Sequence, residues 1–148
     1  MRRLRWLARL VLQVEGSPAR VAVAFGTGIF LAFFPIFGIH TVMALGLAWA
    51  FRLNRVAVLA GTFMNNPWTM GPIYTTGTLV GCALLGVSPK SVSEVGWSLS
   101  GPTLDSLRSL LWPFVVGNLV LGVVAAAIAF FIVRTVLGSR RSRTAEGP

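Results

Sequence analysis

The chain has 148 residues, enough for one domain, and 55% of them are hydrophobic while only 11% are charged. Its mean hydropathy of +0.76 lies far above that of soluble globular proteins and predicts a single all-α integral membrane domain over residues 1–148. The net charge of +9 comes mainly from arginines that flank the apolar blocks, a placement typical of contacts with anionic lipid head groups and not of nucleic-acid binding.

Residues 1–16 predict an amphipathic helix in the membrane interface, because leucines and valines share one face and arginines the other. A frayed basic tail is the alternative interpretation. Arg9, Gln13 and Glu15 interrupt the apolar region that a signal peptide needs, so we expect no cleavage. The membrane-embedded core is then expected to extend over residues 20–137.

The first apolar block, Val21–Phe51, contains no charged residue apart from one histidine. As one helix of 31 residues it would be about 46 Å long, against a hydrocarbon core of about 30 Å. Pro35 and Gly38 divide it into pieces of roughly 14 residues, each about 20 Å long and too short to cross alone. Because Arg52 and Arg55 favour the same side as the N-terminal arginines, we predict a re-entrant hairpin. A single tilted and kinked span is the alternative.

The second apolar block, Val56–Gly86, repeats this design, with a short arm over Val56–Met64 and a longer arm from about residue 70. The two blocks are either a degenerate internal repeat of the kind found in transporters or a coincidence of proline breaks. The predicted structural breaks of both blocks are Pro35, Gly38, Pro67, Gly71 and Pro72.

A polar connection, Val87–Leu111, has balanced charges and is predicted to lie on the non-cytoplasmic side. Within it, Thr103 is expected to cap a short helix. Pro113–Leu137 predicts one plain transmembrane helix, and residues 138–148 a disordered basic tail. The arginine positions predict that both termini are cytoplasmic.

Polar side chains gather at the two breaks. Because broken helices inside a membrane leave unpaired backbone groups, and because restarted helices present positive dipole ends, we hypothesise one ligand-binding site for an anionic group. The alternative is that these side chains only cap the broken helices. The candidate site residues are His40, Thr41, Asn65, Asn66, Thr69 and Tyr74, and the candidate head-group contacts are Arg20, Arg52 and Arg55.

Catalytic and metal-binding chemistry has few residues to use. With Cys82 the only cysteine and His40 the only histidine, an intrachain disulfide and a standard zinc site are excluded. Catalytic triads are disfavoured because Asp105 is the only aspartate, and no phosphate-binding glycine loop or dinucleotide fingerprint occurs. We expect no metal, cofactor or catalytic residue, and an enzyme acting alone is the least favoured interpretation.

Small residues four positions apart permit close helix crossings, either within the chain or in a homodimer. Asn118, in the final span, is expected to make a packing hydrogen bond. The four small-residue pairs are Ala22 with Gly26, Ala24 with Gly28, Gly77 with Gly81, and Gly122 with Ala126.

The ordered motifs Phe34–Thr41, Arg52–Arg55 and Asn66–Thr69, followed by Pro72, resemble the signature of an uncharacterised bacterial membrane family, domain of unknown function number 2062. The resemblance implies a small protein of the bacterial inner membrane and supplies no active residues. Some similar domains are joined to sugar-transferring envelope enzymes, which implies lipid-linked intermediates.

We therefore expect a multi-pass protein that binds or translocates an anionic lipid or envelope intermediate through the polar site at the two breaks. The alternative is a non-catalytic membrane scaffold that docks an envelope enzyme of the glycosyl-transfer type. Membrane lipids are the expected partners, with a homo-oligomer or an envelope enzyme as further ones and no nucleic acid.

Overall fold

The computed structural model describes residues 17–34, 39–88 and 104–145, and this part of the chain is entirely helical, as predicted. The helix predicted over residues 1–16, the first break at 35–38 and most of the polar connection lie outside the described residues. The described helices are α2 (Pro18–Ala32), α3 (His40–Ala50), α4 (Arg55–Thr62), α5 (Pro67–Leu85) and α7 (Leu104–Ala145).

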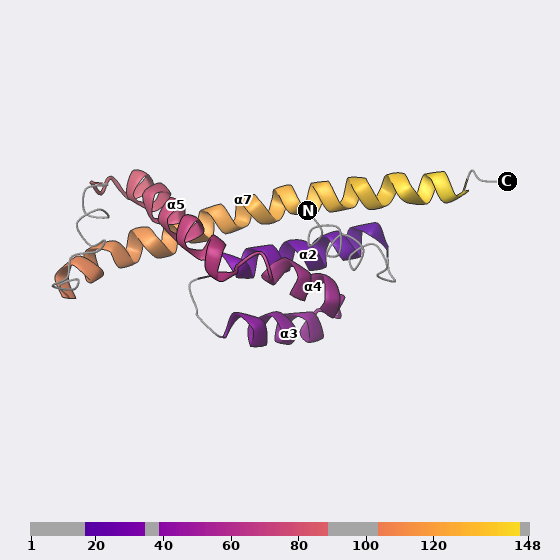
Figure 1. Ribbon diagram of the computed structural model, residues 1–148, viewed down its shortest axis with the longest axis horizontal. Helices are drawn as coiled ribbons and strands as arrows, with labels where there is room; N and C mark the ends of the chain where they lie inside the picture. Colours follow the sequence, from indigo (N-terminus) through magenta and orange to yellow (C-terminus); the bar gives the residue numbers. More distant parts are fainter. Residues whose placement is uncertain (1–16, 35–38, 89–103, 146–148) are drawn as a thin grey trace.

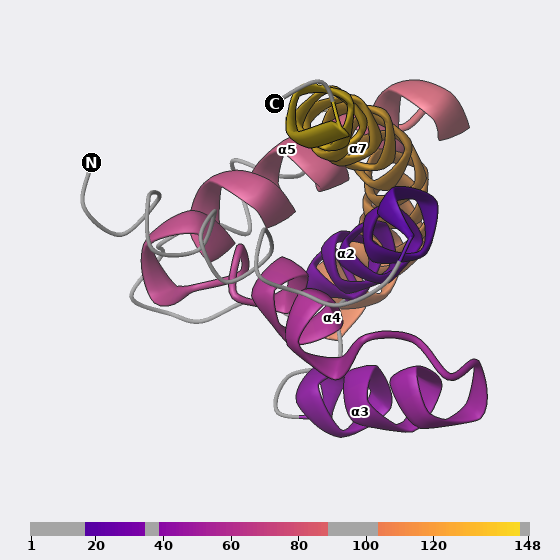
Figure 2. The ribbon, with the colours of Figure 1, turned by 90° about the vertical axis from the view of Figure 1, so that its right-hand side faces the viewer.

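The long helix α7 is the element against which α2 and α5 pack (Figure 1). Helix α5 packs against its N-terminal half and α2 against its C-terminal half, while α4 packs on α2. Helix α3 lies on the outside, on the far side of α4 from α7 (Figure 2). The chain reverses direction after α2 and again after α3. The α3–α4 joint therefore lies towards the same end of the long axis as the start of α2 and the end of α7 (Figure 1).

Three helices begin at residues whose side chains cap them. Ser17, Asn54 and Asn66 each accept a hydrogen bond from the backbone N–H three positions on, which satisfies a group that has no partner within the helix. Ser17 and Asn66 are also followed by proline, whose missing N–H costs nothing at the first helical position. Helix α5 ends at Gly86, which has a φ of 67° that glycine adopts without strain. Local sequence thus sets where these helices begin and end.

The first apolar block forms two antiparallel helices, α2 of 15 residues and α3 of 11 residues (Figure 1). At about 1.5 Å per residue they are about 22 and 16 Å long. The block is therefore divided close to where Pro35 and Gly38 predict, and α2 packs beside α3 instead of continuing into it.

The second break is shorter than predicted. Helix α4 ends at Thr62 and α5 begins at Pro67, so Gly71 and Pro72 lie inside α5 and not in the break. Pro72 removes one hydrogen bond from the ladder, but the capped first turn before it and the packing of α5 on α7 keep the helix continuous.

Helix α7 merges segments that the sequence predicts to be separate. It begins at Leu104 and continues through Pro113, so the short helix expected after Thr103 and the plain span form one element. It also continues to Ala145, through most of the segment predicted to be a disordered tail. Arginine and alanine favour helix, and positive charge near a helix C-terminus is stabilising, which explains this extension.

The crossing of α2 and α4 depends on a pair of facing glycines. A Cβ on Gly28 would overlap the backbone of Val58 and lie 2.9 Å from the Cα of Gly61. A Cβ on Gly61 would overlap the backbone of Phe25 in return. The two helices therefore approach more closely than any side chain at these positions would allow. The buried apolar core beside this crossing consists of Val21, Ala24, Leu31, Ala44, Ala48, Ala57, Val58 and Ala60.

The crossing of α5 and α7 is equally close. A Cβ on Gly81 would overlap the backbone of Pro113, and one on Gly117 would overlap the backbone of Gly77. The Asn118 side chain fills the space beside Gly77 and is fully buried. Its amide donates to the carbonyl oxygen of Phe114 at 2.8 Å, so this hydrogen bond lies within α7 and does not join two helices as the predicted packing hydrogen bond would.

Helices α2 and α7 also meet at small residues. A Cβ on Gly26 would lie 3.1 Å from the carbonyl oxygen of Ala126, and one on Gly122 would lie 3.0 Å from the Cβ of Phe33. The small-residue pairs predicted to permit close crossings are thus found at contacts within one chain.

Candidate functional site

The second break is closed by a capping box. The Asn66 carboxamide oxygen accepts hydrogen bonds from the backbone N–H groups of Trp68 and Thr69, and the Thr69 hydroxyl oxygen accepts one from the Asn66 N–H. The same hydroxyl donates to the carbonyl oxygen of Met64 at 2.6 Å. Asn66 and Thr69 therefore already satisfy the backbone groups that the break exposes, as the capping interpretation expects.

Asn65 lies beside this box and connects it to α5 and α7. Its amide nitrogen donates to the Tyr74 hydroxyl at 3.1 Å, and the Tyr74 ring packs edge-on against Phe114 of α7, with ring centroids 5.4 Å apart. The carboxamide oxygen of Asn65 is buried and has no hydrogen-bond partner among the described residues. An acceptor in this state costs free energy unless something binds it, so this oxygen is the unsatisfied point of the break.

His40 and Thr41 are the first two residues of α3. His40 is half-buried and Thr41 is exposed, and no side chain caps the start of this helix. Hydrogen bonds among the described residues do not connect them to Asn65 or Tyr74. The structure thus brings together Asn65, Asn66, Thr69 and Tyr74, while His40 and Thr41 remain separate in hydrogen bonding.

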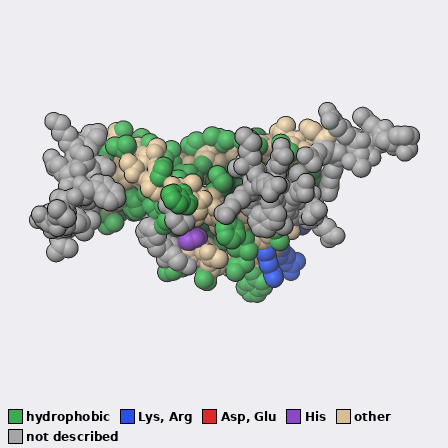
Figure 3. All heavy atoms as spheres, in the orientation of Figure 1, with side chains coloured by type: hydrophobic (Ala, Val, Ile, Leu, Met, Phe, Trp, Pro, Cys, Tyr) green, Lys and Arg blue, Asp and Glu red, His purple; other side chains and the backbone are tan. Residues whose placement is uncertain are grey.

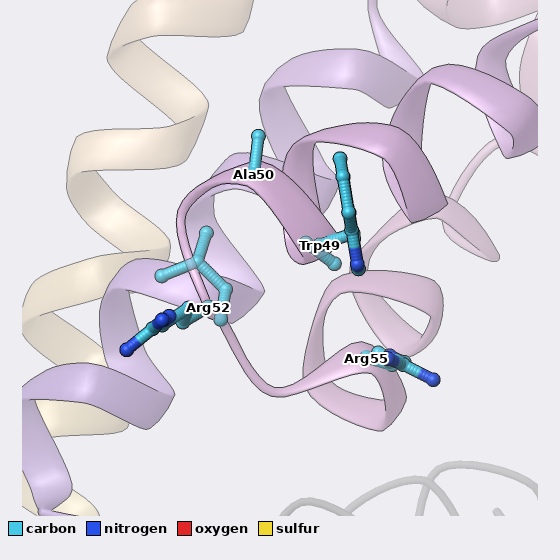
Figure 4. A pocket seen from close by; sticks show the side chains of 6 residues that line it. Trp49, Ala50, Arg52 and Arg55 are labelled. Atoms are coloured by element: carbon cyan, nitrogen blue, oxygen red, sulfur yellow. The ribbon is translucent and has the colours of Figure 1, made fainter.

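An open cavity of about 440 Å³, called the arginine cavity below, lies at the α3–α4 joint. It is lined by Ala48, Trp49, Ala50, Arg52, Leu53 and Arg55 (Figure 4). Arg52 has a φ of 50°, a left-handed conformation that is uncommon outside glycine. Two backbone hydrogen bonds hold it, from Arg52 N–H to the Trp49 carbonyl at 3.2 Å and from Leu53 N–H to the Ala48 carbonyl at 2.8 Å. The turn is therefore fixed with both arginines beside the cavity.

Positive charge marks this end of the molecule. Arg52 and Arg55 are exposed, and arginine side chains gather here on a surface that is otherwise mainly hydrophobic (Figure 3). Among the side chains that the structure describes, none is acidic, so neither arginine has an ion-pair partner in this part of the chain. Arg20, the third predicted head-group contact, is exposed at the start of α2. Within the described residues no cluster of His, Cys, Asp or Glu could hold a metal ion.

Sequence reasoning missed two features of these sites. Trp49 lines the arginine cavity. Its position three residues before Arg52 indicates a shared cavity only when it is known that α3 ends between the two residues. Gly61 faces Gly28, and the Ala57–Gly61 spacing, which follows the same four-residue rule as the predicted pairs, identifies it in retrospect.

Residues 1–146 of the chain match a family model described as "Uncharacterized protein conserved in bacteria (DUF2062)". No curated protein and no solved structure matches the chain. Because this family model extends over nearly the whole sequence, the chain belongs to this bacterial family, as its motifs at the two breaks and the arginine joint predicted.

Proposed function

We propose that this chain is a small integral membrane protein that binds or translocates an anionic lipid or a similar envelope intermediate. Helix α7 supports its placement in a membrane. Residues Leu110–Ser139 are long and apolar enough to cross a bilayer, and only 17% of their most apolar window is buried within the structure. The core helix of a soluble protein would be mostly buried. Contact with membrane lipid therefore explains the exposed apolar surface of α7 more simply.

We further propose that α2 and α3 form a re-entrant hairpin and that α4 and α5 together cross the bilayer in two pieces. Helices of about 22 and 16 Å reach only part of the way through a hydrocarbon core of about 30 Å. The arrangement in Figure 1 supports this topology because the start of α2, the α3–α4 joint and the end of α7 lie towards the same end of the long axis.

Cysteine labelling tests the topology in a Cys82→Ser background. We expect Ala50→Cys, at the exposed end of α3, to be labelled by a membrane-impermeant maleimide only from the cytoplasmic side, because Arg52 and Arg55 follow it. Ser88→Cys, just after α5, should be labelled only from the opposite side. Labelling of both positions from the same side would contradict the proposed crossing by α4 and α5.

The observation that carries the functional proposal is the buried, unpartnered carboxamide oxygen of Asn65 at the second break. Asn66 and Thr69 are committed to capping, whereas Asn65 retains an unused hydrogen-bonding atom beside the Tyr74 hydroxyl. A carboxamide can turn over without changing shape, which exchanges its oxygen and nitrogen. Asn65 can therefore offer an acceptor to a head-group hydroxyl or a donor to a phosphate oxygen.

Replacing Asn65 with leucine tests this site. Leucine has nearly the same shape but its side chain cannot form hydrogen bonds. We therefore expect the transbilayer movement or the retention of fluorescent phosphatidylglycerol in proteoliposomes to fall at least about tenfold. This factor corresponds to the loss of one charge-assisted hydrogen bond. Tyr74→Phe should reduce it less, since Asn65 is kept.

Thr27→Val is the control. The Thr27 hydroxyl donates to the Val23 carbonyl oxygen within α2, a helix that forms neither the second break nor the α5–α7 crossing, so its loss should leave the lipid readout unchanged. If folded Asn65→Leu protein handles the lipid as well as Thr27→Val protein does, the second break is only a structural cap and the proposed site is wrong.

A membrane scaffold that docks an envelope enzyme is the second candidate function. It is favoured by α3, which buries only Ala44 and Ala48 and has open space beside Gly46. A stoichiometric partner that is lost on Gly46→Leu substitution, with lipid handling intact, would favour the scaffold over the lipid site.

A further inference from the structure

We propose that the cavity at the α3–α4 joint is a specific site for one phosphate ester, with Arg52 and Arg55 as its anion-binding groups and Trp49 and Leu53 as its apolar wall. It shares no residue with the second break. The assignment relies on the membrane placement proposed above but not on the Asn65 site.

The charge at the cavity supports an anionic ligand. Arg52 and Arg55 both line it and are exposed, and no acidic side chain in the described part of the chain neutralises either of them. Guanidinium groups match phosphate oxygens in geometry and can bind them through paired hydrogen bonds. In Figure 4 the two side chains point away from each other, from opposite sides of the joint. Exposed arginine side chains change rotamer rapidly, which lets a bound phosphate draw them together.

The size and wall of the cavity indicate more than an inorganic ion. A volume of about 440 Å³ is within the range of small-molecule sites and exceeds what a phosphate alone needs. The Trp49 indole is 75% exposed beside the arginines, and Leu53 is half-buried on the same wall. An apolar surface next to two guanidinium groups matches a ligand with a phosphate at one end and a carbon skeleton at the other.

The backbone at the joint is built to hold this arrangement. Arg52 adopts its left-handed conformation between the end of α3 and the Asn54 cap of α4, and backbone hydrogen bonds from Arg52 and Leu53 return to α3. A fixed turn reduces the ordering that binding requires, leaving mainly the two arginine side chains to be positioned.

Counting retained lipids by native mass spectrometry tests the site. The full-length protein, carrying Asn65→Leu so that the second break binds no lipid, is placed in phosphatidylcholine nanodiscs that contain increasing amounts of phosphatidic acid. We expect retention to saturate at one phosphatidic acid per chain. Arg52→Gln and Arg55→Gln should each weaken it at least about tenfold, the loss of one charge-assisted hydrogen bond. Arg52→Lys should also weaken it, because the charge remains while the paired geometry is lost.

Arg134→Gln is the matched control for charge. Arg134 is exposed on α7 beside the Phe130 ring and is not part of the cavity, so its loss should leave the saturation unchanged. Retention that rises without saturating, or an equal loss in Arg134→Gln, overturns the proposal in favour of diffuse charge attraction. Both arginines of the cavity are exposed, so their variants are expected to fold normally, which thermal melting checks.

Competition with glycerol 3-phosphate separates the two sources of a phosphate ester. If the soluble ester displaces phosphatidic acid fully, the ligand is a soluble phosphate compound. If it does not, the apolar wall contributes and the ligand is a lipid. Failure of the chain to enter nanodiscs refutes the proposed membrane function, whereas entry without saturable retention refutes only this site.

Discussion

Replacing Gly28 with alanine is expected to lower the free energy of unfolding by about 2 kcal/mol. The added Cβ would overlap the backbone of Val58, and the neighbouring atoms of α4 belong to its main chain and cannot rotate away. Overpacking of this kind costs about 3 kcal/mol, while alanine returns about 1 kcal/mol through its higher helix propensity. Reversible unfolding in mixed detergent micelles, followed by far-UV circular dichroism, measures the difference.

Gly46→Ala is the control for that substitution. Gly46 lies in α3 with no atom within 4 Å of an added Cβ, so only the helix propensity changes and stability should rise by up to about 1 kcal/mol. Gly61→Ala should resemble Gly28→Ala, and the double variant should cost less than the sum, because one separation of α2 from α4 relieves both overlaps. Equal effects of Gly28→Ala and Gly46→Ala would show that this crossing is not tight.

The prolines illustrate how much of the fold the sequence can predict. Pro35 lies in the segment between α2 and α3, but α7 runs through Pro113 and α5 through Pro72. A proline removes one hydrogen bond wherever it occurs, and the helix continues when tertiary packing compensates. At Pro113 the backbone packs directly on Gly81, a contact that cannot be read from the proline itself.

The polar residues of the breaks illustrate the same limit for the site. Apolar surroundings and helix breakers predicted one site from both breaks, whereas the hydrogen bonds of Asn65, Asn66, Thr69 and Tyr74 lie at the second break and do not include His40 or Thr41. The sequence could not separate Asn66, whose bonds are used for capping, from Asn65, whose oxygen has no partner in the described part of the chain. That difference depends on which backbone N–H groups each carboxamide faces, a matter of ångströms and not of residue type.

The two glycine crossings support different sites. The α2–α4 crossing lies between the long helix and α3, so it positions the arginine cavity, which α3 and α4 form at their joint. The α5–α7 crossing positions Tyr74 against Phe114 and hence the bond from Asn65. Because the two contacts involve different helix pairs, a change at one crossing should affect one site more than the other.

Gly117→Ala is the second substitution with a large expected effect, a loss of about 2 kcal/mol in the free energy of unfolding. Its Cβ would overlap the backbone of Gly77 and lie 2.5 Å from the backbone nitrogen of Gly81, so α5 must move away from α7. That movement separates Tyr74 from Phe114, and we expect lipid handling at the second break to fall while phosphate-ester retention at the arginine cavity persists.

Gly71→Ala provides the comparison on α5, the partner helix of this crossing. An added Cβ at Gly71 has no atom within 4 Å, so the substitution should leave both readouts unchanged. Gly28→Ala should show the reverse pattern, with retention at the arginine cavity reduced more than lipid handling at the second break. If Gly117→Ala and Gly28→Ala reduce the two readouts in the same proportion, the crossings do not act separately. The fold then behaves as one cooperative unit in which either loosened contact disturbs both sites equally.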